Sequence, residues 1–338
     1  MKFKTVIILL ILFLCLCVGS IFVIKQRGFG HRKKSVGIHL FSNLPVNKIW
    51  EIDIKGADVH VSLIKKDGIW RVKEHFGYMA DFSQISDLID KLKDINTGQS
   101  FRADRDILRR LVLMDPDDPK AKDDEKGRAL ILKDRSGSII KNIIFGKAMK
   151  SQQEEGFPVG QYIRFAESNI VYLIDQYFTV LVQGPREWLK YDIVDVKPDE
   201  IKQVMGYENG ILVYKISKEH GEFKVKKEPK QKRVDDVLKK IKDGLNYLRM
   251  EDVLNPSKKP ASVGIYNKYY IEYILDNGMI YKIYPSKTCS KESCYMKISI
   301  IYNGKNKELL VKAKKMNKLF SPWIYKISKW RHESFFLP

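Results

Sequence analysis

The sequence predicts an α+β fold of two tandem halves, each with a β-hairpin, a helix and a small antiparallel sheet, behind an N-terminal membrane segment. Three observations predict this organisation: an apolar run at residues 5–24, a strand–turn–strand–helix pattern at 59–95, and its return near residue 211. The predicted parts are a cytoplasmic N-terminus (1–4), a transmembrane anchor (5–24), a basic juxtamembrane linker (25–44), a first half (45–195) and a second half (196–338).

The N-terminal run carries no charge between Thr5 and Ile24. A helix of this length spans about 30 Å, the hydrocarbon thickness of a bilayer. A cleaved signal peptide is the main alternative, but its apolar core is normally shorter and is followed by an A-x-A-like site, which this chain lacks. We therefore predict an uncleaved anchor.

The chain carries a net charge of +20. Seven basic and no acidic residues lie in positions 1–34, which leaves an excess of 13 (20 − 7) for the rest of the chain. The basic residues that follow the anchor suit contact with anionic lipid: Lys25, Arg27, Arg32, Lys33 and Lys34. Charge alone does not decide the orientation, because long domains translocate largely regardless of it.

The first half is organised around residues 59–95. Apolar residues alternate with polar ones up to the turn at Asp67-Gly68 and alternate again after it, which indicates a β-hairpin. The apolar period then becomes helical, after Asp81 as a predicted N-cap. The core residues expected in this unit are Trp70, Ile85, Leu88, Ile89 and Leu92.

The second half repeats this order of elements. The core residues expected there are Phe223, Val234, Val237, Leu238 and Ile241, with Phe223 in the place of Trp70. Residues 271–285 then mirror the strands at 128–146, and residues 295–300 and 309–311 mirror the two strands that follow. The shared order predicts a tandem duplication.

The four cysteines form two pairs. Cys15 and Cys17 lie in the apolar run, whereas Cys289 and Cys294 lie in a polar, turn-like stretch. A C-x4-C pair with no histidine or further cysteine nearby in the sequence is a poor zinc site, because structural zinc needs four ligands. Either a local disulfide or two free thiols fits the second pair.

Motifs with catalytic chemistry are missing from the sequence. It contains no HExxH helix, phosphate-binding loop or G-x-S-x-G turn, so we predict no catalytic, cofactor-binding or metal-ligating residues and no enzymatic activity. The charged stretch at 115–126 lacks the glycine and terminal glutamate of a calcium loop, which favours a solvated surface insertion.

Several segments resemble one family: DGIWRVKE, YMADFSQISDLIDKLKDI, LVLMDPDDP, VGQYIRF, NIVYLID and REWLKYDIVDVKPDEIKQV. These motifs, over about residues 45–255, are similar to those of the DUF4340 family. The usual Trp-Arg order of the family is replaced here by Arg186-Glu187-Trp188. The family has no established activity, and its members are often associated with ABC-type export systems, including gliding-motility components. Their soluble part lies outside the cytoplasmic membrane.

The resemblance implies a single-pass protein of the inner membrane with an extracytoplasmic domain. We expect a non-enzymatic accessory or scaffold protein of a bacterial envelope transport complex, with transporter membrane or ATPase subunits as partners. One alternative is a cytoplasm-facing basic module that binds nucleic acid or anionic lipid, although nucleic acid is the less favoured partner. A second alternative is an envelope hydrolase with an unrecognised site.

Overall fold

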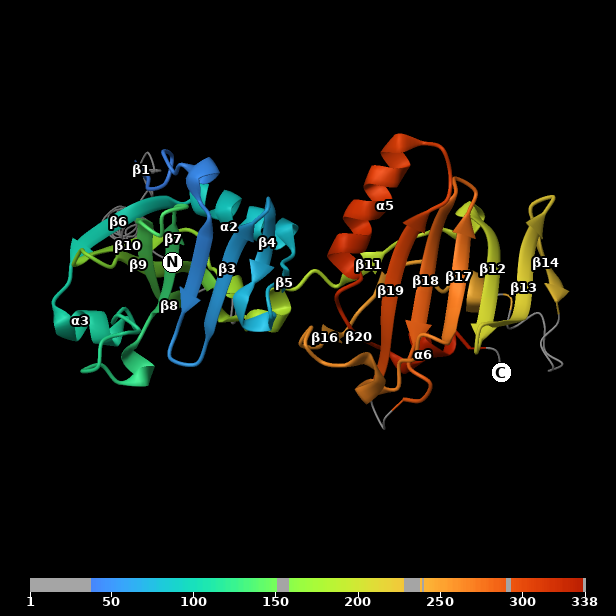
Figure 1. The fold of residues 1–338 in the computed structure, drawn as a ribbon. Helices are drawn as coiled ribbons and strands as arrows, with labels where there is room; N and C mark the ends of the chain where they lie inside the picture. Colours follow the sequence, from blue (N-terminus) through green and yellow to red (C-terminus); the bar gives the residue numbers. More distant parts are fainter. Residues whose placement is uncertain (1–37, 151–157, 228–237, 239, 290–292, 337–338) are drawn as a thin grey trace, which may run out of the picture. The chain divides into compact units, whose positions relative to one another are not determined.

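The computed structural model describes residues 38–150, 158–227, 238, 240–289 and 293–336. Its fold is of the mixed α+β class, with mostly antiparallel sheets and few helices, which confirms the predicted class (Figure 1). The anchor predicted at 5–24 lies outside the described residues. Among the residues that are described, no helix combines the length and the apolarity needed to cross a bilayer.

The first sheet has the strand order β1-β6-β10-β9-β8-β7-β2-β3-β4-β5. Its strands are β1 (Ile38–His39), β2 (Glu51–Lys55), β3 (His60–Lys66), β4 (Ile69–Val72), β5 (Tyr78–Met79), β6 (Asn96–Arg102), β7 (Arg128–Lys133), β8 (Ile139–Lys150), β9 (Pro158–Phe165) and β10 (Ile170–Ile174). Two α-helices lie between its strands in the sequence, α2 (Phe82–Lys93) and α3 (Arg105–Arg110).

The second sheet has the strand order β14-β13-β12-β17-β18-β19-β20-β16. Its strands are β12 (Ile201–Glu208), β13 (Ile211–Glu219), β14 (Glu222–Lys227), β16 (Asp252–Val253), β17 (Tyr269–Leu275), β18 (Met279–Pro285), β19 (Cys294–Tyr302) and β20 (Tyr325–Ile327). The helix α5 (Lys307–Phe320) lies along β19, and the short helix α6 (Lys329–Glu333) follows β20 (Figure 1).

Short elements complete the described chain. The strands β11 (Asp192–Val194) and β15 (Leu248–Arg249) form a separate two-stranded sheet. Single turns of 3-10 helix are η1 (Val46–Lys48), η2 (Lys73–His75), η3 (Asp123–Glu125), η4 (Thr179–Val182), η5 (Pro185–Trp188), η6 (Pro198–Glu200) and η7 (Pro260–Val263).

Both sheets repeat one strand order. The run β4-β3-β2-β7-β8-β9-β10-β6 of the first sheet has the same chain order as β14-β13-β12-β17-β18-β19-β20-β16 of the second. The hairpin registers agree as well, because Trp70 is paired with Lys65 and Phe223 with Lys218, each at the second pair from its turn. Phe223 thus occupies the position of Trp70.

The two hairpin turns also share their backbone conformation. Asp67 and Gly68 have φ of 53° and 77°, and His220 and Gly221 have φ of 52° and 84°. Positive φ at both central residues is the type I′ turn, whose twist matches that of the flanking strands.

The core residues expected in the first half are all buried: Trp70, Ile85, Leu88, Ile89 and Leu92. Asp81 precedes α2, and its carboxylate accepts a hydrogen bond from the Ser83 N–H at 2.9 Å. This bond satisfies a donor of the first helical turn, which has no partner within the helix.

The corresponding positions of the second half are less uniform. Ile241 is buried and Leu238 is half-buried, whereas Val234 and Val237 lie outside the described residues. The expectation of a core position is wrong for Phe223, which is only half-buried. The reason is its place on β14, which is an edge strand of this sheet, because none of the strands in the described residues pairs with its other side.

The strand expected at residues 309–311 is also wrong, because these residues lie in α5. Asn306 caps this helix by accepting hydrogen bonds from the N–H groups of Glu308 and Leu309. The strand that corresponds to β10 is instead β20, which lies beyond α5 in the chain.

Candidate functional site

Two groups of polar side chains in the described part of the chain could bind a ligand. The first is the charged segment 104–126 that follows β6, and the second is the pair Cys289 and Cys294 with His332. The partners of each charged group show whether it serves the fold or remains available to a ligand.

The charged segment is anchored by an apolar cluster beneath it. Leu108 of α3 and the following Leu113 and Met114 are buried among residues of β7, β8 and β10. The loop that follows is closed by two backbone hydrogen bonds, from the Met114 N–H to the Glu125 carbonyl (3.1 Å) and from the Gly127 N–H to the Met114 carbonyl (2.8 Å). The insertion predicted from its composition is therefore a folded loop with its ends joined.

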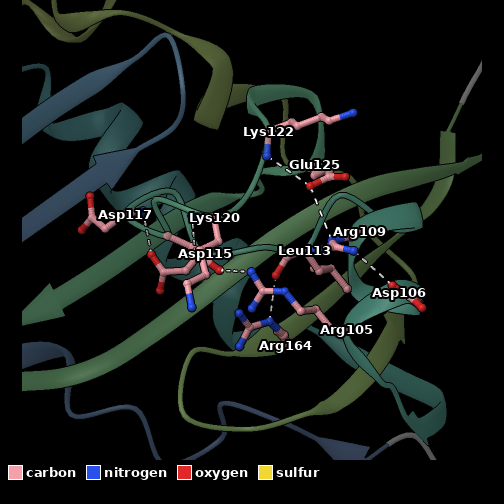
Figure 2. Close-up of polar contacts among 11 residues, drawn as sticks. Arg105, Asp106, Arg109, Leu113, Asp115, Asp117, Lys120, Lys122, Glu125 and Arg164 are labelled. Carbon is pink, nitrogen blue, oxygen red and sulfur yellow. Dashed lines mark hydrogen bonds and ion pairs between the residues drawn. The ribbon is translucent and has the colours of Figure 1, made fainter.

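Carboxylates within this loop bind backbone N–H groups and arginines (Figure 2). Asp118 accepts from the Lys120 N–H at 2.8 Å and pairs with Arg105 at 2.8 Å. The hydrogen bond from the Lys120 N–H and the charge of Arg105 lower the pKa of Asp118. Glu125 accepts from the Lys122 N–H at 3.1 Å and lies 3.7 Å from the Arg109 Nε. These bonds hold the loop in shape.

Arg164 on β9 is the buried charge of this region. Its guanidinium donates to the carbonyl oxygens of Leu113 (2.8 Å), Phe165 (3.2 Å), Ala166 (2.8 Å) and Ser168 (3.3 Å), as the close-up in Figure 2 shows for Leu113. A buried arginine whose donors are used in this way ties loop ends to the sheet. We assign it a structural role.

The two cysteines predicted as a pair are joined by a disulfide in the structure. Cys289 follows β18 and is half-buried, whereas Cys294 begins β19 and is buried. Their Cα atoms are 4.5 Å apart. The bond therefore closes the connection between two neighbouring strands.

His332 on α6 is the residue that sequence reasoning missed. It lies 38 positions beyond Cys294 (332 − 294), and no local pattern relates the two. The fold nevertheless places its Nδ1 3.3 Å from the Cys289 sulfur, and the three side chains have the separations of a metal-ligand cluster. Ser328 caps helix α6, because its hydroxyl accepts a hydrogen bond from the Arg331 N–H.

The second ring nitrogen of His332 is also bound. Its Nε2 lies 2.7 Å from the Ser286 carbonyl oxygen and 3.2 Å from the Ser286 hydroxyl. The ring is 5% exposed, and its burial lowers the pKa of His332, against the opposing effect of the Ser286 carbonyl. This shift favours the neutral form of the imidazole.

The described residues thus form an α+β protein with two sheets of common strand order. The charged segment 104–126 has a structural role, whereas Cys289, Cys294 and His332 form a cluster that could take part in redox or metal chemistry. The chain belongs to the family described as a domain of unknown function, DUF4340, whose model matches residues 70–265. The match confirms the resemblance seen in the sequence motifs. Comparisons with curated proteins and with solved structures found no match.

Proposed function

We propose that this protein is a membrane-anchored, non-enzymatic accessory or scaffold protein of a bacterial ABC-type envelope transport complex. In this proposal residues 5–24 form the anchor, and the two sheet-containing halves lie outside the cytoplasmic membrane and bind a partner. The observation that carries the proposal is the common strand order of the two sheets. We infer from it that a tandem duplication produced the halves 45–195 and 196–338.

The repeat supports a binding role. Two copies of one unit offer related surfaces to a partner, and duplication of a scaffold requires no catalytic centre in either copy. In segment 104–126, Asp118 and Glu125 are paired with Arg105 and Arg109, which supports a structural role for these four charged groups. Membership in the DUF4340 family supports the association with an export system, through the family traits that the resemblance implies.

Co-purification tests the proposed complex. The full-length chain, tagged at its C-terminus, is extracted in mild detergent from bacterial cells that produce an ABC-type export system. We expect transporter membrane or ATPase subunits to co-elute with it. Recovery of the chain without any such subunit, while those subunits are present in the extract, would contradict the proposal.

Orientation separates this proposal from the cytoplasm-facing alternative. A protease added to intact spheroplasts should degrade the halves 45–195 and 196–338 if they lie outside the cytoplasmic membrane. Protection of both halves until the spheroplasts are lysed would favour a cytoplasmic module, for which the excess of 13 positive charges beyond residue 34 provides the attraction to anionic lipid or nucleic acid.

A further inference from the structure

The Nδ1 atom of His332 is the starting observation. Its neighbour Nε2 faces the Ser286 carbonyl oxygen at 2.7 Å. A carbonyl oxygen only accepts hydrogen bonds, so Nε2 carries the proton of the neutral ring, and Nδ1 presents a lone pair. That lone pair is directed at the Cys289 sulfur, 3.3 Å away.

A disulfide sulfur has no proton to donate to this lone pair. Among the described residues, the oxidised form therefore offers this acceptor no hydrogen-bond donor, which is costly inside a protein. Two other states of the same residues satisfy it: a Cys289 thiol that donates to Nδ1, or a cation that Nδ1 coordinates. The thiol requires the disulfide to open, and so does a cation that the two cysteines bind as thiolates together with Nδ1.

The support of His332 resembles that of a metal-binding histidine. Such residues donate their second ring N–H to a carbonyl or carboxylate, which fixes the tautomer and the orientation of the ring. Ser286 provides this carbonyl, and its own position is fixed because its N–H donates to the Tyr295 carbonyl at 2.7 Å. The Ser286 hydroxyl also accepts from the Tyr295 N–H at 3.1 Å.

We propose that Cys289, Cys294 and His332 form a redox-controlled site that binds Zn²⁺ through two thiolates and Nδ1 when the disulfide is reduced. Zinc takes cysteine sulfur at about 2.3 Å and histidine nitrogen at about 2.0–2.1 Å. Three protein ligands leave its fourth position for water or an external ligand. The half-buried Cys289 gives the ion a route to the two buried ligands.

Reduction of the disulfide and the zinc binding that follows are balanced in electrons and protons. An external dithiol supplies two electrons and two protons to the Cys289–Cys294 bond and closes to its own disulfide. Zn²⁺ then displaces the two thiol protons, so two protons are released for each ion bound. The resulting centre, with two thiolates and a neutral imidazole, has no net charge, which suits a buried position.

Zinc binding by the full-length chain in mild detergent tests this proposal. A Cys15→Ser/Cys17→Ser background removes the other two thiols. The protein is prepared in the disulfide form or reduced with a phosphine, and each form is dialysed against Zn²⁺ before its metal content is measured. We expect one ion per reduced chain and none per oxidised chain. Co²⁺ in place of Zn²⁺ should give a thiolate-to-cobalt charge-transfer band in the reduced form.

Variants identify the ligands. Cys289→Ser or His332→Gln should weaken zinc binding by about 100-fold or more, because each removes a direct ligand and even a supporting residue is worth 10- to 100-fold. His220→Asn is the matched control, because it removes an exposed histidine and retains a residue that tolerates the positive φ of its turn. It should bind zinc like the background protein.

Two outcomes would overturn the proposal. One is a reduced chain that binds no zinc and gives no charge-transfer band with Co²⁺. This measurement uses the background protein and does not depend on the folding of a ligand variant. The other is zinc binding that Cys289→Ser and His332→Gln leave unchanged, provided that circular dichroism shows both variants to be folded. That result would place the ion at other residues.

Discussion

At the scale of single residues, the fold uses arginine as a connector of loops. Arg164 and Arg331 are buried, and each donates to four backbone carbonyls. The carbonyls bound by Arg331 belong to residues 243–247, which are distant in the sequence. The alternating pattern around Arg164 predicts a strand but not a buried charge, because the carbonyls that satisfy it are brought near only by the tertiary fold.

Replacement of Arg164 by methionine tests this role. Arg164→Met retains an apolar stem but removes every donor, so the carbonyls that it binds lose those partners. We expect the free energy of unfolding in urea to fall by about 3 kcal/mol. Arg110→Met, at an exposed site on α3, is the control and should change it by less than about 0.5 kcal/mol. Equal effects of the two substitutions would argue against the connecting role.

A second residue-scale prediction concerns acid stability. Asp53 is buried, which by itself raises the pKa of its carboxyl group, but the hydrogen bonds and charge of Lys133 lower it below the usual 3.8. A carboxyl group whose pKa is lower in the folded state stabilises the fold above its unfolded pKa. That stabilisation is lost as pH falls through the folded value.

Asp53→Asn removes this titration. The free energy of unfolding of the variant should therefore fall less steeply than that of the parent protein as the pH falls through the usual carboxyl pKa of 3.8 and below it. Urea unfolding at several pH values measures both slopes. Parallel pH profiles would show that Asp53 has the same pKa in the folded and unfolded states.

At the scale of elements, the hairpin and helix at 59–95 were the most predictable part of the chain. The alternation, the Asp-Gly turn and the helical spacing agree with β3, β4 and α2, because local preference and burial favour the same structure there. The prediction of a strand at 309–311 is wrong because three apolar residues in a row do not distinguish a strand from a turn of helix. Its helix depends on the Asn306 cap.

The repeated hairpin allows a paired measurement. Trp70 is 7% exposed, so Trp70→Ala should reduce the free energy of unfolding by about 3–5 kcal/mol. Phe223 occupies the same register position on β14 but is half-buried, so Phe223→Ala should cost only about 1 kcal/mol.

Urea unfolding of both variants, followed by far-ultraviolet circular dichroism, gives the two values. A Trp70→Ala protein of unchanged stability that no longer retains the transporter subunits would instead identify this hairpin as a partner-binding surface. Equal losses of unfolding free energy at the two positions would contradict the expected difference between β4, which has a strand on each side, and the edge strand β14.

At the scale of the whole molecule, the repeat was predicted from order alone and the cluster of His332 with the cysteines was not. Hairpin, helix and strand patterns recur in the sequence, so their shared order can be compared without a structure. The position of α6 beside the end of β18 depends instead on long-range packing, for which the sequence around His332 carries no periodic signal. The repeated order of elements is therefore easier to predict from this sequence than the contact between His332 and the two cysteines.

The proposed membrane attachment is a property of the whole molecule, and two mechanisms could produce it. The anchor predicted at 5–24 would hold the chain by hydrophobic insertion, whereas the net charge of +20 would hold it on anionic lipid by electrostatic attraction. Salt distinguishes the two, because at about 1 M the screening length falls to about 3 Å and surface charge attraction is largely lost. We expect the full-length chain to stay in the membrane fraction after a wash at this salt concentration.

Substitution within the run completes this test. Leu12→Arg places a charge near the centre of the apolar segment, where insertion costs about 2.5–3.5 kcal/mol more, and should shift part of the chain to the soluble fraction. The matched control is Lys33→Gln/Lys34→Gln, which lowers the charge of the linker and leaves the run intact. Quantitative immunoblots of washed membranes compare the variants. Release of the parent protein by salt, or of the linker variant but not of Leu12→Arg, would establish that charge and not the anchor holds the chain at the membrane.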